Sequence, residues 1–369
     1  MLRDLRISGF RGFREFAMSG LGRVNLLVGT NNCGKTSVLE AIHLLSVPGS
    51  SVPLWQTQDR RGELVESAGR QIDLAHIVHG HEIRAGRGFM VAGTTEDGRQ
   101  VLDASFAVPD MKIKELYDDD EDDEVSSTPV LLDPLMLRFE WRTGSSQAEG
   151  SLPITLRLPV TRYGGLHDNP AFTFNGRSVA KARSPVMFVT TEGLTRESVV
   201  VMFEQVVLTP DENTVLRALH TIDSGIERIA SIGTQRRNRR GARGGLAMMV
   251  AGQRIPIGTM GDGIWRLLGI ALALVQARGG VLLVDEIDTG LHYSVLVDMW
   301  RLVFETARSL DVQVFATTHS RDCHEALAAV AEPGRNEISL QRIERGKVEA
   351  IAFSEAEIRQ AAERGLEVR

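Results

Sequence analysis

The period of the hydrophobic pattern changes along the chain, and these changes predict where strands and helices lie. Near the N-terminus, apolar and polar residues alternate through LRISGFRGFREF, with interruptions at Gly9 and Gly12, which predicts an edge hairpin. A continuous apolar run follows at residues 24–28, and apolar residues then recur at helical spacing as far as Leu45. This order predicts a buried parallel strand, a loop and an amphipathic helix.

The middle of the chain has a weaker pattern, with frequent glycine, proline and serine. Short β-like runs recur at residues 88–91, 104–108, 135–141, 152–160 and 186–190. We therefore expect residues 48–209 to form a β-rich lobe, inserted into a domain made of residues 1–47 and 210–369.

The second half of the chain alternates between the two periods. Helical spacing of apolar residues is found at residues 209–232, 264–275 and 295–304. Apolar runs of strand length are found at residues 281–284, 312–317, 338–343 and 348–353. A capping box at Ser354 and Glu357 predicts the start of a last helix. Strands that alternate with helices predict an α/β domain.

The composition is that of a globular protein with about two domains: 369 residues, 43% hydrophobic and 24% charged. No apolar run approaches the roughly 20 residues that a membrane span needs. The first residues are strand-like rather than a signal peptide, so we expect a cytoplasmic protein with no membrane partner. The two cysteines, Cys33 and Cys323, exclude a disulfide scaffold and a Cys-rich zinc site. The net charge of −6 means that any nucleic-acid contact must be local.

The loop between the first buried strand and the first helix carries the clearest chemical signal. GTNNCGKT, residues 29–36, fits the phosphate-loop pattern G-x-x-x-x-G-K-[ST] without a mismatch. The glycines let backbone N–H groups turn toward a phosphate, and the helix N-terminus favours the same anion. Lys35 supplies a positive charge for the β- and γ-phosphates, and Thr36 supplies a hydroxyl for Mg²⁺. We predict a nucleoside triphosphate held by Gly29, Thr30, Asn31, Asn32, Cys33, Gly34, Lys35, Thr36 and Ser37.

Polar residues that follow the next two buried strands predict the rest of the site. Asp285 and Glu286 follow residues 281–284, and nucleotides bind at the carboxyl ends of the strands in open α/β sheets. Asp285 fits the shell of a Mg²⁺ ion, and Glu286 fits the group that polarises the attacking water. His319 follows the third strand and can donate to a γ-phosphate. An acidic strand exit and an unrelated surface histidine are the alternatives.

Other charged clusters have two interpretations each. Arg11 and Arg14 can reach a nucleotide, although a solvated strand face explains them equally well. The acidic run at residues 118–124 is most simply a disordered loop tip, with a carboxylate metal site as the alternative. Neither a cysteine nor a helical register supports a metal site at the neighbouring histidines His76, His79 and His81.

The segments FRGF, GTNNCGKT, MGDGIWRLL, VLLVDEIDTGLH and VFATTHS together resemble the ABC-type AAA-family ATPases of the RecF, SMC and OLD kind, in particular the small stand-alone ATP-binding proteins of OLD-like systems. The resemblance implies a P-loop NTPase fold and hydrolysis of ATP with Mg²⁺. It also implies that Lys35 and Thr36 are the Walker A lysine and the Mg²⁺ ligand, Asp285 the Walker B aspartate, Glu286 the catalytic glutamate and His319 the switch histidine.

The same resemblance places a second nucleotide contact before the apolar helix. Gly261, Asp262 and Gly263 stand where the signature motif belongs, and such a glycine turn presents backbone N–H groups to an anion. Residues 288–292 stand where the D-loop belongs. The family's signature serine has no counterpart here. For the Q-loop, Gln71 is only a candidate.

The resemblance implies a homodimer that forms around two ATP molecules and controls a partner effector. No heptad pattern persists as in the arms of SMC proteins, and no acidic cluster of a TOPRIM nuclease follows His319. We therefore expect the effector to be a separately encoded polypeptide, such as a TOPRIM-type nuclease in anti-phage defence. The alternative is a nucleotide-gated DNA-binding clamp in DNA repair or maintenance.

The arginine-rich stretch at residues 236–243 yields a testable prediction. It is either a solvated loop or a contact with nucleic-acid phosphates. If it contacts phosphates, replacing its arginines with glutamine will weaken DNA or RNA binding and flatten its salt dependence, because fewer counterions are released on binding when contacts are lost. The arginines are Arg236, Arg237, Arg239, Arg240 and Arg243. Titration at several salt concentrations measures the slope, and ATP binding serves as the control. An unchanged slope leaves the loop as a solvated one.

Overall fold

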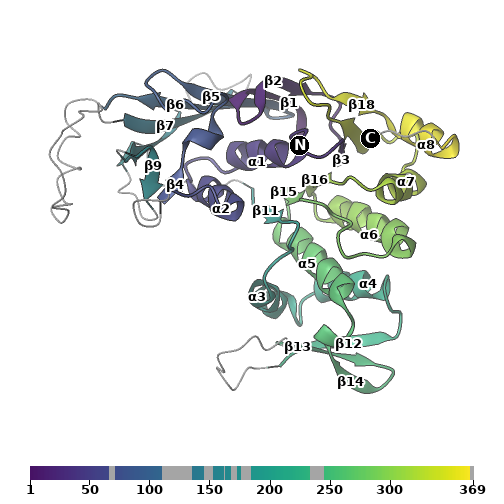
Figure 1. Ribbon diagram of the computed structural model, residues 1–369. Coiled ribbons are helices and arrows are strands. Elements are labelled where there is room, and N and C mark those ends of the chain that lie inside the picture. The colour runs from purple at the N-terminus through teal and green to yellow at the C-terminus, as the bar shows by residue number, and fades with distance from the viewer. Residues whose placement is uncertain are drawn as a thin grey trace. The chain divides into compact units, whose positions relative to one another are not determined.

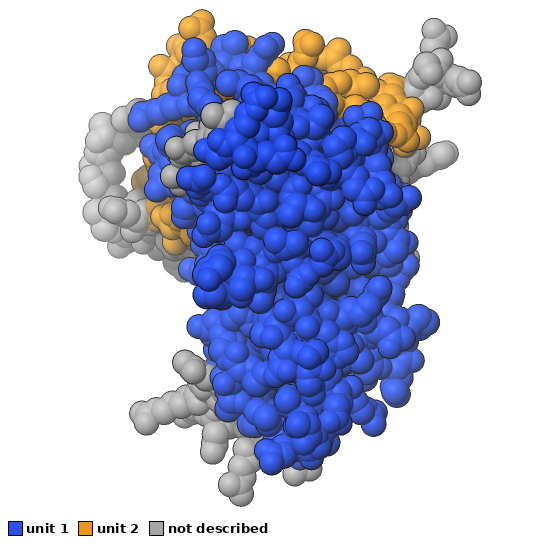
Figure 2. Space-filling view, turned by 90° about the vertical axis from the view of Figure 1, so that its right-hand side faces the viewer, with its two compact units in different colours: residues 1–2, 18–39, 183–369 blue, residues 3–17, 40–182 orange. Residues whose placement is uncertain are grey.

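The computed structural model describes residues 1–65, 71–109, 135–144, 153–161, 163–167, 173–175, 184–232 and 245–365. The chain divides into two compact units, coloured blue and orange in Figure 2. Unit 1 comprises Met1–Leu2, Met18–Leu39 and Arg183–Arg369, and unit 2 comprises Arg3–Ala17 and Glu40–Ala182. The acidic run at 118–124 and the arginine-rich stretch at 236–243 lie outside the described residues.

Unit 1 is built on a six-stranded sheet with the order β11-β15-β16-β3-β17-β18. Its strands are β11 (Val186–Val189), β15 (Val281–Val284), β16 (Gln313–Thr317), β3 (Val24–Val28), β17 (Ile338–Arg342) and β18 (Ile351–Phe353). All neighbours pair in parallel except β17 and β18, which are antiparallel. Every residue of β3 and of β16 is buried, as expected for parallel strands covered on both faces.

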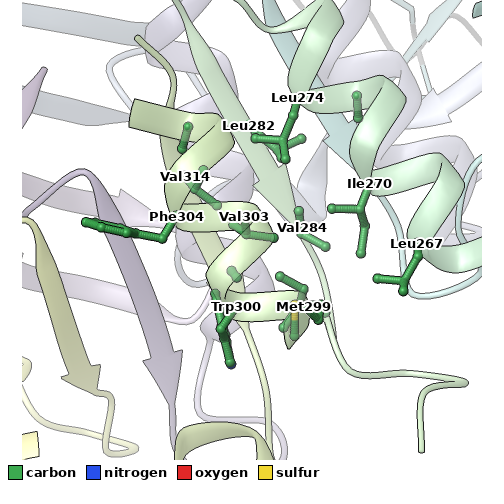
Figure 3. Packing of buried hydrophobic residues seen from close by; sticks show 14 of the residues in the cluster. Leu267, Ile270, Leu274, Leu282, Val284, Met299, Trp300, Val303, Phe304 and Val314 are labelled. Carbon is green, nitrogen blue, oxygen red and sulfur yellow. The ribbon is translucent and has the colours of Figure 1, made fainter. Parts of the chain in front are cut away.

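Helices pack on this sheet, and their apolar faces form the core of unit 1 (Figure 1). They include α5 (Asp262–Gln276), α6 (Leu296–Ser309), α7 (Arg321–Val330) and α8 (Glu355–Glu363). Helices α3 (Arg196–Val206) and α4 (Glu212–His220) pack instead against α5. Figure 3 shows Leu267, Ile270 and Leu274 of α5 on the side of Leu282 and Val284 of β15. The fully buried ring of Trp300 on α6 donates its Nε1–H to the carbonyl of Cys323 on α7 at 2.9 Å. These contacts confirm the predicted α/β class.

The apolar spacing predicts one helix over residues 209–232, but the structure contains a helix and a strand there. Helix α4 ends at His220, and β12 (Ile226–Ser231) then pairs with β13 (Leu246–Val250) and β14 (Gln253–Pro256) in a small antiparallel sheet. A turn breaks the helix because the Asp223 carboxylate accepts the N–H of Gly225 at 2.8 Å. The β-branched isoleucines after it pack on a sheet instead of a helix face.

Unit 2 contains a seven-stranded sheet with the order β10-β8-β7-β6-β5-β1-β2. Its strands are β10 (Thr173–Asn175), β8 (Ile154–Val160), β7 (Leu135–Gly144), β6 (Gly98–Ala107), β5 (Gly88–Thr95), β1 (Leu2–Phe10) and β2 (Phe13–Met18). The pairs from β10 to β5 are antiparallel. Smaller elements are α2 (Val52–Arg61), β4 (Gln71–Asp73), η1 (Ala75–Ile77) and β9 (Gly165–His167). Unit 2 is therefore built mainly of strands.

The boundaries of the two units differ from those expected. Residues 183–209 belong to unit 1 because β11 pairs in parallel with β15, from Val186 with Val281 to Val189 with Val284. Most of the N-terminal hairpin belongs to unit 2 because β1 and β2 extend the antiparallel sheet. Helix α1 (Lys35–Ser46) begins in unit 1 and ends in unit 2. Strand pairing between distant segments decides these boundaries, and a local pattern does not contain it.

Arg11 is paired with side chains of unit 2. Its side chain is buried, and its guanidinium reaches the carboxylates of Glu40 at 2.7 Å and Glu63 at 2.9 Å, and the amide oxygen of Gln58 at 2.6 Å. Neither a nucleotide contact nor a solvated strand face describes this residue, whereas Arg14 is exposed. A buried guanidinium needs such partners, because an unpaired charge is costly away from water.

No described helix is long and apolar enough to cross a membrane. No group of three or more His, Cys, Asp or Glu side chains in that part is placed to hold a metal ion. At the histidine cluster, Nδ1 of His76 lies 3.2 Å from Nδ1 of His81, and Nδ1 of His79 lies 3.0 Å from the carbonyl oxygen of Arg11.

A buried carboxylate at the start of α8 gives the first stability prediction. Glu355 accepts the backbone N–H groups of four successive residues, 335–338, at 2.9 to 3.1 Å, and so fixes the loop that leads into β17. An amide at this position has one acceptor oxygen and turns N–H donors toward N–H donors. We expect Glu355→Gln to lower the free energy of unfolding by about 2 to 4 kcal/mol.

Denaturant unfolding measures this change, and the matched control is Glu363→Gln on the same helix. Glu363 is exposed, so its substitution will change stability by less than about 0.5 kcal/mol. Equal stability of the two variants contradicts an anchoring role for Glu355.

Candidate functional site

The candidate site begins where β3 ends. Gly29 has a φ of 144°, and a Cβ atom there would lie 2.3 Å from the carbonyl oxygen of Ile343, so this position accepts only glycine. The N–H of Ile343 in turn donates to the carbonyl of Val28 at 2.9 Å. Gly34, with a φ of 104°, completes the turn into α1. The segment after β17 therefore closes one side of the loop and fixes its path.

Lys35 folds back over the loop that precedes it. Its Nζ donates to the carbonyl oxygens of Gly29 at 2.8 Å and Thr30 at 3.0 Å, and the residue is 9% exposed. Neutral carbonyls accept two of its three N–H groups but do not balance its charge. An anion that enters the loop meets an ammonium already directed toward it, together with the N-terminus of α1.

Asp285 brings the ends of three strands together. It follows β15, and its Oδ1 accepts a hydrogen bond of 2.7 Å from the hydroxyl of Thr317, the last residue of β16. The hydroxyl of Thr36, which follows β3 and the loop, lies 3.2 Å from Oδ1 and 3.1 Å from Oδ2. A hydroxyl beside a carboxylate is a pair of hard oxygen donors, which suits Mg²⁺. The residues present therefore fit this ion.

Glu286 is held by its backbone in an uncommon conformation. Its φ is 48°, in the left-handed region that non-glycine residues seldom adopt. Its N–H donates to the hydroxyl of Thr317 at 2.8 Å, and its carbonyl accepts from the guanidinium of Arg266 at 2.7 Å. The carboxylate lies 3.5 Å from Nδ1 of His319 and 3.3 Å from the hydroxyl of Thr289. Glu286 and His319 thus lie side by side.

The glycine turn before α5 is open. Gly261 caps the helix with a φ of 87°, and a Cβ atom there would meet no other atom within 4 Å. A Cβ atom on Gly263 would lie 3.0 Å from the carbonyl of Gly290, so the turn adjoins residues 288–292. Asp288 in that segment accepts the hydroxyl of Thr318 at 2.7 Å, directly before His319. The turn and residues 288–292, which follow Glu286 in sequence, are therefore neighbours.

Two residues of the site, Thr317 and Arg266, were not predicted from the sequence. Thr317 binds both members of the acidic pair, and its position as the last residue before Thr318 and His319 was the available signal. Arg266 is buried on α5, and it is the single charged residue in the otherwise apolar run at residues 264–275. Burial lowers the pKa of Arg266 below its ordinary value, against the opposing effect of the nearby carboxylates, Asp288 first.

Gln71, the candidate for the Q-loop, lies in unit 2 on β4, where its amide oxygen accepts a hydrogen bond of 2.9 Å from the hydroxyl of Thr161. In unit 1, the strand next to β15 is β11, and residues 190–193 follow its carboxyl end. This loop contains no glutamine, and the carbonyl of Thr190 accepts from Arg266 at 2.6 Å. This loop is therefore bound to α5 through a backbone carbonyl and not through a glutamine side chain.

Comparisons with known proteins show which families and proteins this chain is similar to. A family model described as "AAA domain, putative AbiEii toxin, Type IV TA system" matches residues 130–322, and one described as "AAA ATPase domain" matches residues 1–74. An ATP/GTP phosphatase of Helicobacter pylori is 21% identical over 353 residues, which cover 89% of this chain and 88% of that protein. The DNA replication and repair protein RecF of Idiomarina loihiensis is 44% identical over 52 residues, 14% of this chain and 15% of RecF. Among solved structures, the chain is similar to an SMC head bound to the C-winged helix domain of ScpA. The match covers 96% of this chain and 98% of the SMC head, at 13% identity and a TM-score of 0.47.

Proposed function

We propose that this chain, which belongs to the AAA-domain family whose model matches residues 130–322, binds ATP with Mg²⁺ and hydrolyses it within an ATP-bridged dimer. It is an ABC-type ATPase of the RecF and SMC kind. One arrangement supports the proposed function most strongly: the Thr36 hydroxyl lies 3.1 Å from the Asp285 carboxylate. The two residues are far apart in sequence, and the parallel sheet brings them together beside Lys35.

The phosphate loop and the acidic pair receive the following roles. Residues 29–37 surround the phosphates with backbone N–H groups, and Lys35 leaves its two carbonyl partners to meet the β- and γ-phosphates. Thr36 and Asp285 hold Mg²⁺, which when bound neutralises part of the phosphate charge. Each role uses a group that already points into the loop region or lies at a strand's carboxyl end.

Glu286 and His319 are assigned to the hydrolytic step. The carboxylate of Glu286 orients a water molecule toward the γ-phosphorus and accepts its proton as the bond from γ-phosphorus to the bridging oxygen breaks. His319, 3.5 Å from that carboxylate, donates to the γ-phosphate. The products are ADP and inorganic phosphate.

The second copy of the chain contributes the glycine turn. Gly261, Asp262 and Gly263 lie at the N-terminus of α5, where backbone N–H groups attract an anion, and space around Gly261 is open. We assign this turn to the γ-phosphate held by the other copy. No signature serine is present, so the contact is made through backbone N–H groups alone.

We propose that the ATP-driven dimer controls a separately encoded effector, such as a TOPRIM-type nuclease, in defence against phage. The description of the matched family, an AbiEii toxin of a type IV toxin–antitoxin system, supports a role in defence. The likeness to RecF, which carries the DNA-clamp alternative, extends over only 14% of this chain. Co-purification of a nuclease favours the first function, whereas tight, salt-sensitive DNA binding by the isolated chain favours the second.

Three substitutions test the ATPase and its dimer. Glu286→Gln is expected to retain ATP affinity and to reduce turnover by on the order of 100-fold or more, because the positioned base is lost. This variant will accumulate as an ATP-bound dimer. Lys35→Ala will lose nucleotide binding, and Gly261→Asp will bind ATP but fail to pair, because a side chain and a further negative charge enter the anion-binding turn.

Light scattering with Mg-ATP measures the association of each variant. If Glu286→Gln associates no more than Lys35→Ala, the ATP-bridged dimer is wrong. Crosslinking between cysteines placed beside Gly261 and Gly34 accompanies the measurement, since a dimer formed through other surfaces will not give that crosslink.

A further inference from the structure

A buried arginine joins the helix of the glycine turn to the backbone of the catalytic carboxylate. Arg266 lies on α5, about one helical turn beyond the Gly261 cap, and is 7% exposed. Its Nη2 donates to the carbonyls of Asp285 at 2.8 Å and Glu286 at 2.7 Å, and its Nη1 donates to the carbonyl of Thr190 at 2.6 Å. One guanidinium therefore holds three carbonyls from two separate loops.

The partners of Arg266 are unusual for a buried charge. A guanidinium away from water is most often paired with a carboxylate, which balances its charge directly. Here the hydrogen bonds go to backbone carbonyls, although the carboxylates of Asp285, Glu286 and Asp288 are near enough to favour the charged form. The arrangement fixes the course of the backbone and leaves the carboxylates free for other partners.

The backbone that Arg266 holds is also strained. Glu286 has a φ of 48°, a conformation that persists in a non-glycine residue only when its surroundings impose it. Its N–H is held by Thr317 and its carbonyl by Arg266. The direction of the Glu286 side chain follows from these two hydrogen bonds, since they fix the peptide groups on both sides of its Cα atom.

We propose that Arg266 is a positioning residue that makes the orientation of Glu286 depend on the position of α5. The open turn at Gly261 begins that helix, so a second copy that binds the turn fixes the position of α5. Arg266 transmits the position of α5 to Glu286 and to the loop at Thr190. Association of two copies and activation of water are thereby linked. This role rests on the proposed function of Glu286 and of the glycine turn.

The test compares Arg266 variants in two backgrounds. Arg266→Met keeps the length of the side chain without its donors, and Arg266→Lys keeps the charge on one nitrogen that cannot reach both loops. The matched control is Arg278→Met, because Arg278 lies just beyond the end of α5, is exposed and pairs with Asp211 at 2.6 Å. For each variant, the Kd for ATP and kcat are measured in full-length protein with and without Glu286→Gln.

A positioning role predicts a specific pattern. Arg266→Met will leave the Kd for ATP within about threefold and lower kcat by about 10- to 100-fold, while Arg266→Lys will retain part of the activity. In the Glu286→Gln background, Arg266→Met will lower the residual kcat by less than about threefold, because the group that it positions is already absent. Arg278→Met will match the parent chain in both backgrounds.

The opposing results are equally specific. An equal loss of kcat in both backgrounds, or loss of ATP binding by both the methionine and the lysine variants, assigns Arg266 to general stability and overturns the positioning role. An unchanged kcat for Arg266→Met overturns the positioning role as well. Two other results would show that the proposed function itself is wrong: ATP binding that survives Lys35→Ala, or turnover that is unchanged by Glu286→Gln alone.

Discussion

The parallel pairing of β3, β16 and β15 is the constraint on which the whole site depends. Val24 of β3 pairs with Val314 of β16, and Gln313 of β16 pairs with Val281 of β15. Parallel strands in such a register place their carboxyl ends along one edge of the sheet. The phosphate loop, Thr317 and Asp285 meet there because Thr317 ends β16, whereas the loop and Asp285 directly follow β3 and β15. A shift in this register separates Thr36 from Asp285 and leaves no common place for a cation.

Charge at this edge is distributed in a way that favours a cation and a polyanion together. Asp285 receives two hydroxyls, from Thr36 and Thr317, and these neutral donors orient its carboxylate without balancing its charge. Lys35 is directed to carbonyls rather than to this carboxylate. An ion pair between Lys35 and Asp285 would neutralise both groups and compete with a ligand. Their separate partners keep one negative and one positive group available, which is the requirement of a metal–nucleotide complex.

The residues of helix α1 are divided between the two units. Lys35 begins the helix in unit 1, and Glu40 lies in unit 2 with its carboxylate fully buried. Arg11, Arg60 and Arg61 all reach that carboxylate, at 2.7 to 3.1 Å. Removal of Glu40 would take a buried carboxylate from all three guanidinium groups, so the cost of such a change falls on the helix that also carries Lys35.

The motif residues of the site could be predicted from sequence because a local spacing defines each of them. A phosphate loop has a fixed length, and an acidic pair or a histidine directly follows a buried strand, so Lys35, Asp285 and His319 carry their signal in their neighbours. The predicted core strands 24–28 and 281–284 coincide with β3 and β15 for the same reason. The helix expected at residues 209–232 failed where the Asp223–Gly225 turn outweighed the apolar spacing.

The residues that position the motif could not be predicted in this way, because their partners are chosen by packing. Arg266 and Glu286 are separated by 20 residues, and Arg266 and Thr190 by 76. Their contact exists only when α5 has docked on β15 and β11 has joined the edge of the sheet. The sequence shows that a charged residue interrupts an apolar helix face, which indicates that a buried partner is needed, but the acceptors are backbone carbonyls that every residue possesses. Side-chain chemistry at a strand end is therefore visible in the sequence, whereas the backbone geometry that orients it depends on the folded sheet.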